Sequence, residues 1–94
     1  SVGIEFSSPL NLEKFQTWMS GLLQIHGPDI FRCKGILNFI GMDNRVVFQG
    51  VHMLFDAQPD RPWKNEEEKR NQLIFIGRNL DRKMLNTGIK SCLA

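Results

Sequence analysis

The chain has 94 residues and a mass of 10.9 kDa, which is enough for one small domain, because two separate cores would each be too small to fold unaided. Hydrophobic residues make up 41% and charged residues 23%, a composition that excludes a disordered chain. The formal net charge is +2, too small an excess to indicate a nucleic-acid or membrane surface. No apolar run approaches the roughly 18–20 residues that a membrane-spanning helix needs, so we expect no membrane partner.

The first half of the chain predicts a strand, a helix and a hairpin. Residues 2–6 alternate between apolar and other side chains, which is typical of a strand with one covered face. Residues 11–26 predict an amphipathic helix capped by Asn11, since apolar side chains recur at helical spacing. Residues 30–40 and 45–55 predict two long strands joined by a turn rich in Gly, Asp and Asn.

The strand predicted over 30–40 has two different faces. One face is mixed and carries Arg32 and Lys34, and we expect it to stay open to a partner. The other face is expected to be buried, and it comprises Phe31, Cys33, Gly35, Leu37 and Phe39.

The second half of the chain predicts a loop, a strand and a helix. Residues 56–71 are polar, include two prolines and predict a long loop with at most one helical turn. Residues 72–77 predict a strand with apolar residues on both faces, and Asn79 is the expected cap of the last helix. The order is therefore β-α-β-β-(loop)-β-α, an α+β fold with a mainly antiparallel sheet and two helices packed on one face.

Four side chains could in principle bind a metal ion. They are His26, Cys33, His52 and Cys92. None has the close spacing of a zinc motif, so the favoured interpretation is that both cysteines are reduced and face the core while His26 lies at a helix end. Reduced thiols are typical of a cytoplasmic protein. A metal-binding module stays open as an alternative.

Arg32 and Lys34 could serve a sheet that binds single-stranded nucleic acid. Such sheets stack bases on exposed aromatic side chains, but Phe31 and Phe39 are expected on the opposite face. Nucleic acid is therefore the less favoured partner, and salt bridges to acids of the 56–71 loop are the favoured role of the two cations.

Trp63 stands in the polar segment Arg61-Pro62-Trp63-Lys64. A Trp in such a place either folds back as a lid on the core or anchors a partner protein. We favour the lid, because burial of so large a side chain is also favourable within one chain.

Short segments across the whole chain resemble the CobW C-terminal domain family. The segments are Leu10–Phe15 with Trp18, Asp29–Leu37, Phe48–His52 (FQGVH), Pro62-Trp63, Leu73–Asp81 (ending IGRNLD) and Cys92-Leu93. The resemblance implies a domain that follows a P-loop GTPase domain in metallochaperones for zinc or cobalt, some of them linked to cobalamin synthesis. It implies GTP, Mg²⁺ and zinc or cobalt as cofactors of the full-length protein, with its own N-terminal GTPase domain and a metalloprotein client as partners.

The nucleotide loop of such GTPases is absent from this sequence, which has no run of glycines before a Lys and a Ser or Thr. We therefore expect residues 1–94 to be one domain of a longer protein, without an enzymatic activity, catalytic residue or cofactor of its own. The resemblance favours a regulatory or protein-interaction domain. The candidate contact residues on its surface are Arg32, Lys34, His52, Trp63 and Arg78.

Overall fold

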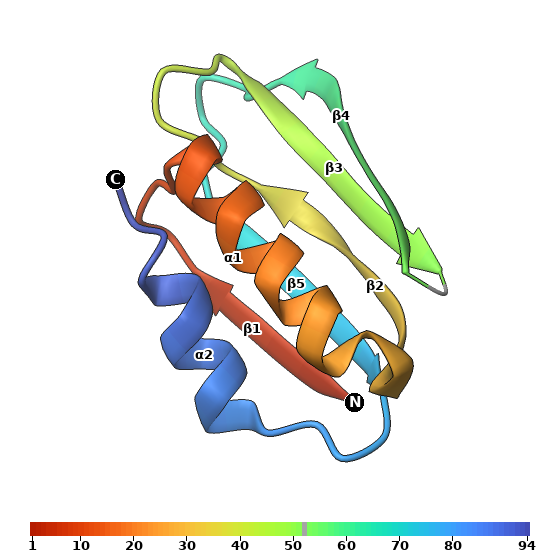
Figure 1. Cartoon of the computed structure of the whole chain (residues 1–94). Coiled ribbons are helices and arrows are strands. Elements are labelled where there is room, and N and C mark those ends of the chain that lie inside the picture. Colours follow the sequence, from red (N-terminus) through yellow and green to blue (C-terminus); the bar gives the residue numbers. More distant parts are fainter. Residues whose placement is uncertain (52) are drawn as a thin grey trace.

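The computed structural model describes residues 1–51 and 53–94 as one sheet covered by helices on one side (Figure 1). His52 lies outside the described residues. The elements in chain order are β1 Val2–Phe6, α1 Leu12–His26, the short 3-10 turn η1 Gly27–Asp29, β2 Ile30–Leu37, β3 Asn44–Val51, β4 Leu54–Pro62, β5 Asn71–Gly77 and α2 Arg82–Lys90.

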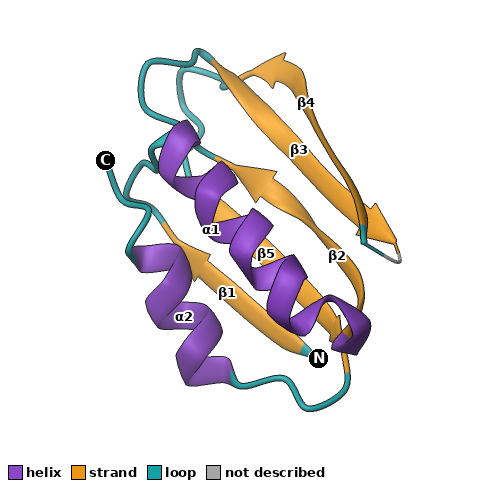
Figure 2. Cartoon of the chain, in the orientation of Figure 1, coloured by secondary structure: helices purple, strands orange, loops and turns teal. Residues whose placement is uncertain are grey.

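The sheet has five strands in the order β1-β5-β2-β3-β4, and each neighbouring pair is antiparallel. Both helices lie on the same side of it, with α1 across the middle strands and α2 beside β1 (Figure 2). This arrangement confirms the predicted α+β fold with two helices on one face. Among the described residues, the opposite face of the sheet carries no helix.

Helix α1 forms where the sequence predicts it. Asn11 caps it, and the Asn11 side chain accepts a hydrogen bond from the backbone N–H of Lys14 at 2.9 Å. Phe15, Met19 and Leu22 face the sheet and are buried, as their helical spacing predicts.

One buried polar residue connects several backbone segments at one end of the core by hydrogen bonds. Asn71 is fully buried, and its Oδ1 accepts a hydrogen bond from the backbone N–H of Asn38 at 2.8 Å. Its Nδ2 donates to the carbonyl of Ser8 at 2.8 Å and to that of Phe6 at 3.2 Å. These bonds fix the segment after β1 against the ends of β2 and β5 and compensate for the burial of the amide.

The strand predicted over 45–55 is wrong in its extent. Strand β3 ends at Val51, and β4 starts at Leu54 and runs back beside it, so an edge strand occupies the first part of the predicted 56–71 loop. The reversal includes Met53 at a positive φ of 72°. Gly50 marks a close approach, because a Cβ there would lie 2.2 Å from the Phe55 ring.

Phe31 is not on the buried face. It is 43% exposed, whereas the preceding residue Ile30, which alternation would place on the mixed face, is 1% exposed. The reason is a shift in the β2–β5 pairing between Ile30 and Arg32, which adds a residue and breaks the alternation at this point. The prediction holds for Cys33, and also for Phe39, which is buried just beyond the end of β2.

Asn79 does not cap the last helix. It adopts a positive φ of 54°, and the cap is Asp81, whose side chain accepts a hydrogen bond from the backbone N–H of Met84 at 3.1 Å. Asn is one of the few residues that tolerate the left-handed conformation. Asn79 therefore turns the chain between β5 and α2 instead.

Candidate functional site: the open face of the sheet

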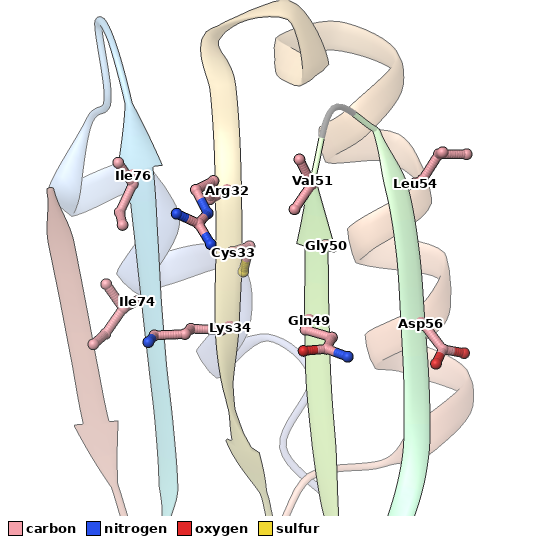
Figure 3. Close-up of a pocket in the computed structure, with 10 residues that line it drawn as sticks. All are labelled: Arg32, Cys33, Lys34, Gln49, Gly50, Val51, Leu54, Asp56, Ile74 and Ile76. Carbon is pink, nitrogen blue, oxygen red and sulfur yellow. The ribbon is translucent and has the colours of Figure 1, made fainter.

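The face of the sheet opposite the helices presents two rows of side chains (Figure 3). Each row crosses four strands, because residues paired in neighbouring antiparallel strands point to the same side. In strand order β5, β2, β3, β4, the first row is Ile76, Arg32, Val51 and Leu54, and the second row is Ile74, Lys34, Gln49 and Asp56. We call these eight residues the open face.

The open face lines a hollow of about 560 Å³. Its apolar members are well exposed, at 40% for Ile76, 42% for Ile74, 45% for Val51 and 80% for Leu54. Four large aliphatic side chains exposed together are a common mark of an interaction surface.

Arg32 and Lys34 stand in the middle of this surface on β2. Among the described residues, no carboxylate lies within salt-bridge distance of either side chain, so the predicted salt bridges to acids of the loop are wrong. Those acids pair elsewhere: Glu67 accepts from Arg61 at 2.7 Å, and Glu68 lies 3.5 Å from Arg70.

Asp56 is the only acid of the open face. It lies two strands away from Lys34 in the second row, and Gln58 Nε2 donates to its Oδ1 at 3.0 Å. The open face is therefore positive along β2, negative at β4 and apolar around both.

Trp63 folds back on the molecule, but not on the helix-covered core. It is half-buried, its backbone N–H donates to the carbonyl of Asp43 at 3.2 Å, and its ring lines a hollow with Ile36 and Gln72. Ile36 pairs with Gln72 one row beyond Lys34, so Trp63 covers the sheet next to the open face. Its Nε1 is buried and has no hydrogen-bond partner among the described residues.

Arg78 is engaged at the end of the sheet, away from the hollow. Its Nε donates to Asp29 Oδ1 at 2.8 Å, and its guanidinium lies 5.9 Å from the centre of the Phe31 ring. The structure thus brings Arg32 and Lys34 together, with Trp63 beyond one end of the hollow beside Ile36 and Arg78 beyond the other end beside Phe31. His52, the remaining contact candidate, lies outside the described residues.

The described metal-binding candidates lie on different elements. His26 ends α1, Cys33 lies on β2 and Cys92 follows α2, and the described part of the chain contains no group of three His, Cys, Asp or Glu side chains that could hold an ion. Both cysteines are buried and free. Burial raises the pKa of Cys33 to about 12 and also raises that of Cys92, which keeps both thiols protonated and disfavours metal binding.

Sequence reasoning missed most of the apolar open face. The signal for Ile74 and Ile76 was present, since both faces of 72–77 are apolar. Leu54 and Asp56 gave no such signal, because their place on the face depends on a reversal of the chain after Val51 that the sequence did not show. The described residues include no helix long and apolar enough to cross a membrane.

The fold and the sequence motifs agree with one family. Residues 1–93 match the family model described as the cobalamin synthesis protein CobW C-terminal domain. The chain belongs to this family, as the motifs from Phe48 to Asp81 indicate.

Two characterised relatives are zinc chaperones. The chain is 35% identical over 77 residues to the zinc chaperone YjiA of Escherichia coli, covering 82% of this chain and 24% of YjiA. It is 35% identical over 66 residues to the zinc chaperone CobW of Pseudomonas aeruginosa, covering 70% of this chain and 18% of CobW. The chain thus spans about a quarter or less of these relatives.

The same fold is present in solved structures of YjiA. The Zn(II)-bound YjiA GTPase from E. coli and a Zn(II)-bound triple mutant of it both superpose with a TM-score of 0.92 at 29% identity. Each match covers 99% of this chain and 29% of the YjiA chain. The chain therefore corresponds in fold to one part of the YjiA GTPase.

Proposed function

We propose that this chain is the C-terminal interaction domain of a GTP-dependent metal chaperone, and that its open face docks on the N-terminal GTPase domain of the same protein. In this proposal the GTPase domain binds GTP with Mg²⁺ and handles the metal, which is zinc or cobalt and is cargo for a metalloprotein client. The present domain performs no chemistry and regulates the GTPase domain through contact.

One observation carries the proposal: the open face combines four exposed aliphatic side chains with two cations that have no carboxylate partner among the described residues. Membership in the CobW family and the larger size of the relatives support a partner within the same polypeptide. The near-neutral charge also suits a protein partner better than nucleic acid, whose binding needs a larger basic surface.

The test is the double variant Arg32→Glu and Lys34→Glu in the full-length protein. Reversal of both charges should undock the domain, so the radius of gyration in small-angle scattering should increase. The GTP hydrolysis rate should change by about fivefold or more, the lower end of typical coupling between sites. A matched control is Lys64→Glu with Lys69→Glu, the same charge change on exposed residues between β4 and β5.

An unchanged radius and an unchanged hydrolysis rate in the Arg32 and Lys34 variant would contradict the proposal. The control variant should behave as the wild type in both measurements. Binding of single-stranded nucleic acid that disappears only in the open-face variant, and falls steeply with salt, would favour the nucleic-acid alternative instead.

A further inference from the structure

We infer that the open face receives an amphipathic helix of the N-terminal GTPase domain, and that this helix presents two carboxylates one turn apart to Arg32 and Lys34. The inference rests on the proposed function, because it names the segment that docks. Four properties of the described residues lead to it: the spacing of the two cations, the pairing of the strand that carries them, the charge at β4, and the place where the chain enters the sheet.

The spacing of the cations matches that of carboxylates on a helix. Arg32 and Lys34 are two residues apart on β2 and point to the same face, so their Cβ atoms lie roughly 7 Å apart. Side chains three or four residues apart on a helix have Cβ atoms about 5–6 Å apart, within reach of both cations. Arg32 is also the one arginine of the described residues whose side chain has neither an ion pair nor a hydrogen bond, whereas four others pair with carboxylates and Arg82 donates to a carbonyl.

The backbone of the sheet excludes an added strand at this place. Strand β2 is hydrogen-bonded on both sides, to β5 and to β3, so a partner can reach Arg32 and Lys34 only through side chains above the sheet. A helix covers a sheet face in this way, as α1 does on the other side. The apolar stripe of such a helix would pack on the four aliphatic side chains of the open face.

The charge at β4 gives the helix an orientation. Asp56 lies at the β4 end of the second row and repels a carboxylate there (Figure 3). The acidic side of the helix should therefore face β2, and a neutral or basic side chain should face β4. The surface thus selects the charge pattern of its occupant as well as its hydrophobicity.

The place where the chain enters the sheet favours a segment of the same polypeptide as the occupant of the open face. Val2, the first residue of β1, pairs with Phe75, which precedes Ile76 of the first row of the open face. Figure 1 shows the N-terminus at the end of the sheet where β5 ends. In the proposed protein the GTPase domain precedes β1, so the covalent connection would raise its effective concentration near this face.

The direct test is zero-length cross-linking of the dilute full-length protein with a carbodiimide, followed by peptide mass spectrometry. The reagent activates a carboxylate, which then forms an amide with a contacting lysine Nζ, so that one water is lost overall. Lys34 should link to an Asp or Glu in a helix of the GTPase domain of the same molecule. A second acid should lie three or four residues away. Lys64 and Lys69, exposed between β4 and β5, serve as internal controls and should not link to that helix.

A charge exchange completes the test. Changing the two helix acids to Lys in the Arg32→Glu and Lys34→Glu variant reverses both partners of each ion pair, so the attraction should return. The radius of gyration should then fall back to the wild-type value, and the hydrolysis rate should come within about twofold of wild type.

The outcomes distinguish two claims: that the docked segment is a helix, and that the open face docks on the GTPase domain at all. A link from Lys34 to a strand or loop of the GTPase domain would overturn the helix but keep the proposed function. A link only to a separate chain, no link at all, or a charge exchange that restores nothing would overturn the inference. The scattering and hydrolysis experiment on the Arg32 and Lys34 variant judges the proposed function by itself.

Discussion

At the scale of single residues, the contact between Gly88 and Trp18 shows how close packing restricts the residue type at one position. A Cβ on Gly88 would lie 2.2 Å from Trp18 Nε1, and the indole is held between Phe15 and Phe75. We predict that Gly88→Ala lowers the free energy of unfolding by about 1–2 kcal/mol, because overpacking outweighs the better helix propensity of Ala. Urea denaturation of both proteins measures the difference.

Gly21 is the matched control at the same scale. It also lies within a helix, α1, but a Cβ there would meet no atom within 4 Å. Gly21→Ala should therefore raise the free energy of unfolding by up to about 1 kcal/mol. Equal effects of the two substitutions would contradict the importance of the Trp18 contact.

At the scale of elements, the sequence predicts a helix or strand correctly where apolar residues mark the element along its whole length. β1, α1 and β5 are predicted within one residue at each end, because β1 and α1 have a clear apolar period and β5 has a continuous apolar run. Strand β4 is missed because it is an edge strand: it pairs only with β3, tolerates Pro59 and Pro62, and carries polar residues on the exposed side.

The connection from β4 to β5 is held by an ion pair that titrates. Arg61 donates to both carboxylate oxygens of Glu67 at 2.7 Å, and the backbone N–H of Lys64 donates at 3.0 Å. These bonds lower the pKa of Glu67 from 4.5 to about 2. Because the pKa is lower in the folded state, the stabilisation is complete above about pH 4.5 and disappears as the pH falls towards 2.

We predict that Glu67→Gln lowers the thermal unfolding midpoint at pH 7 and that the difference from the wild type shrinks between about pH 5 and pH 2. The pair is partly exposed, so the shift should be small, a few degrees at most. Glu66→Gln is the control, because Glu66 is an exposed neighbour that forms no ion pair among the described residues, and this variant should show the same unfolding midpoint as the wild type. A constant difference between Glu67→Gln and the wild type would exclude titration of Glu67 as its cause.

At the scale of the whole molecule, the candidate site could be predicted only in its centre. Alternation along one strand is enough to place Arg32 and Lys34 on the mixed face. Their neighbours Val51, Leu54 and Asp56 come from a hairpin whose reversal the sequence did not reveal. Long-range pairing decides which side chains share a surface, and a single sequence contains little information about it.

The two thiols provide a last prediction about the molecule as a whole. Cys33 is 2% exposed on β2 at the centre of the sheet, with a pKa of about 12, whereas Cys92 is 1% exposed but lies in the irregular segment that follows α2. A thiol reagent should therefore label Cys33 only through global unfolding. Cys92 should react at least about tenfold faster, because an irregular segment after a helix opens locally more easily than the central strand of a sheet.

Single-thiol variants, Cys33→Ala and Cys92→Ala, separate the two rates, which a chromogenic disulfide reagent measures against urea concentration. The Cys33 rate should rise steeply with urea in parallel with unfolding, while the Cys92 rate should stay nearly flat at low urea. Because the two thiols lie on different elements and are kept protonated by burial, one equivalent of zinc should leave both rates unchanged. Protection of both thiols by zinc in the two-cysteine protein would instead support the metal-binding alternative and contradict an interaction domain that leaves metal to its partner.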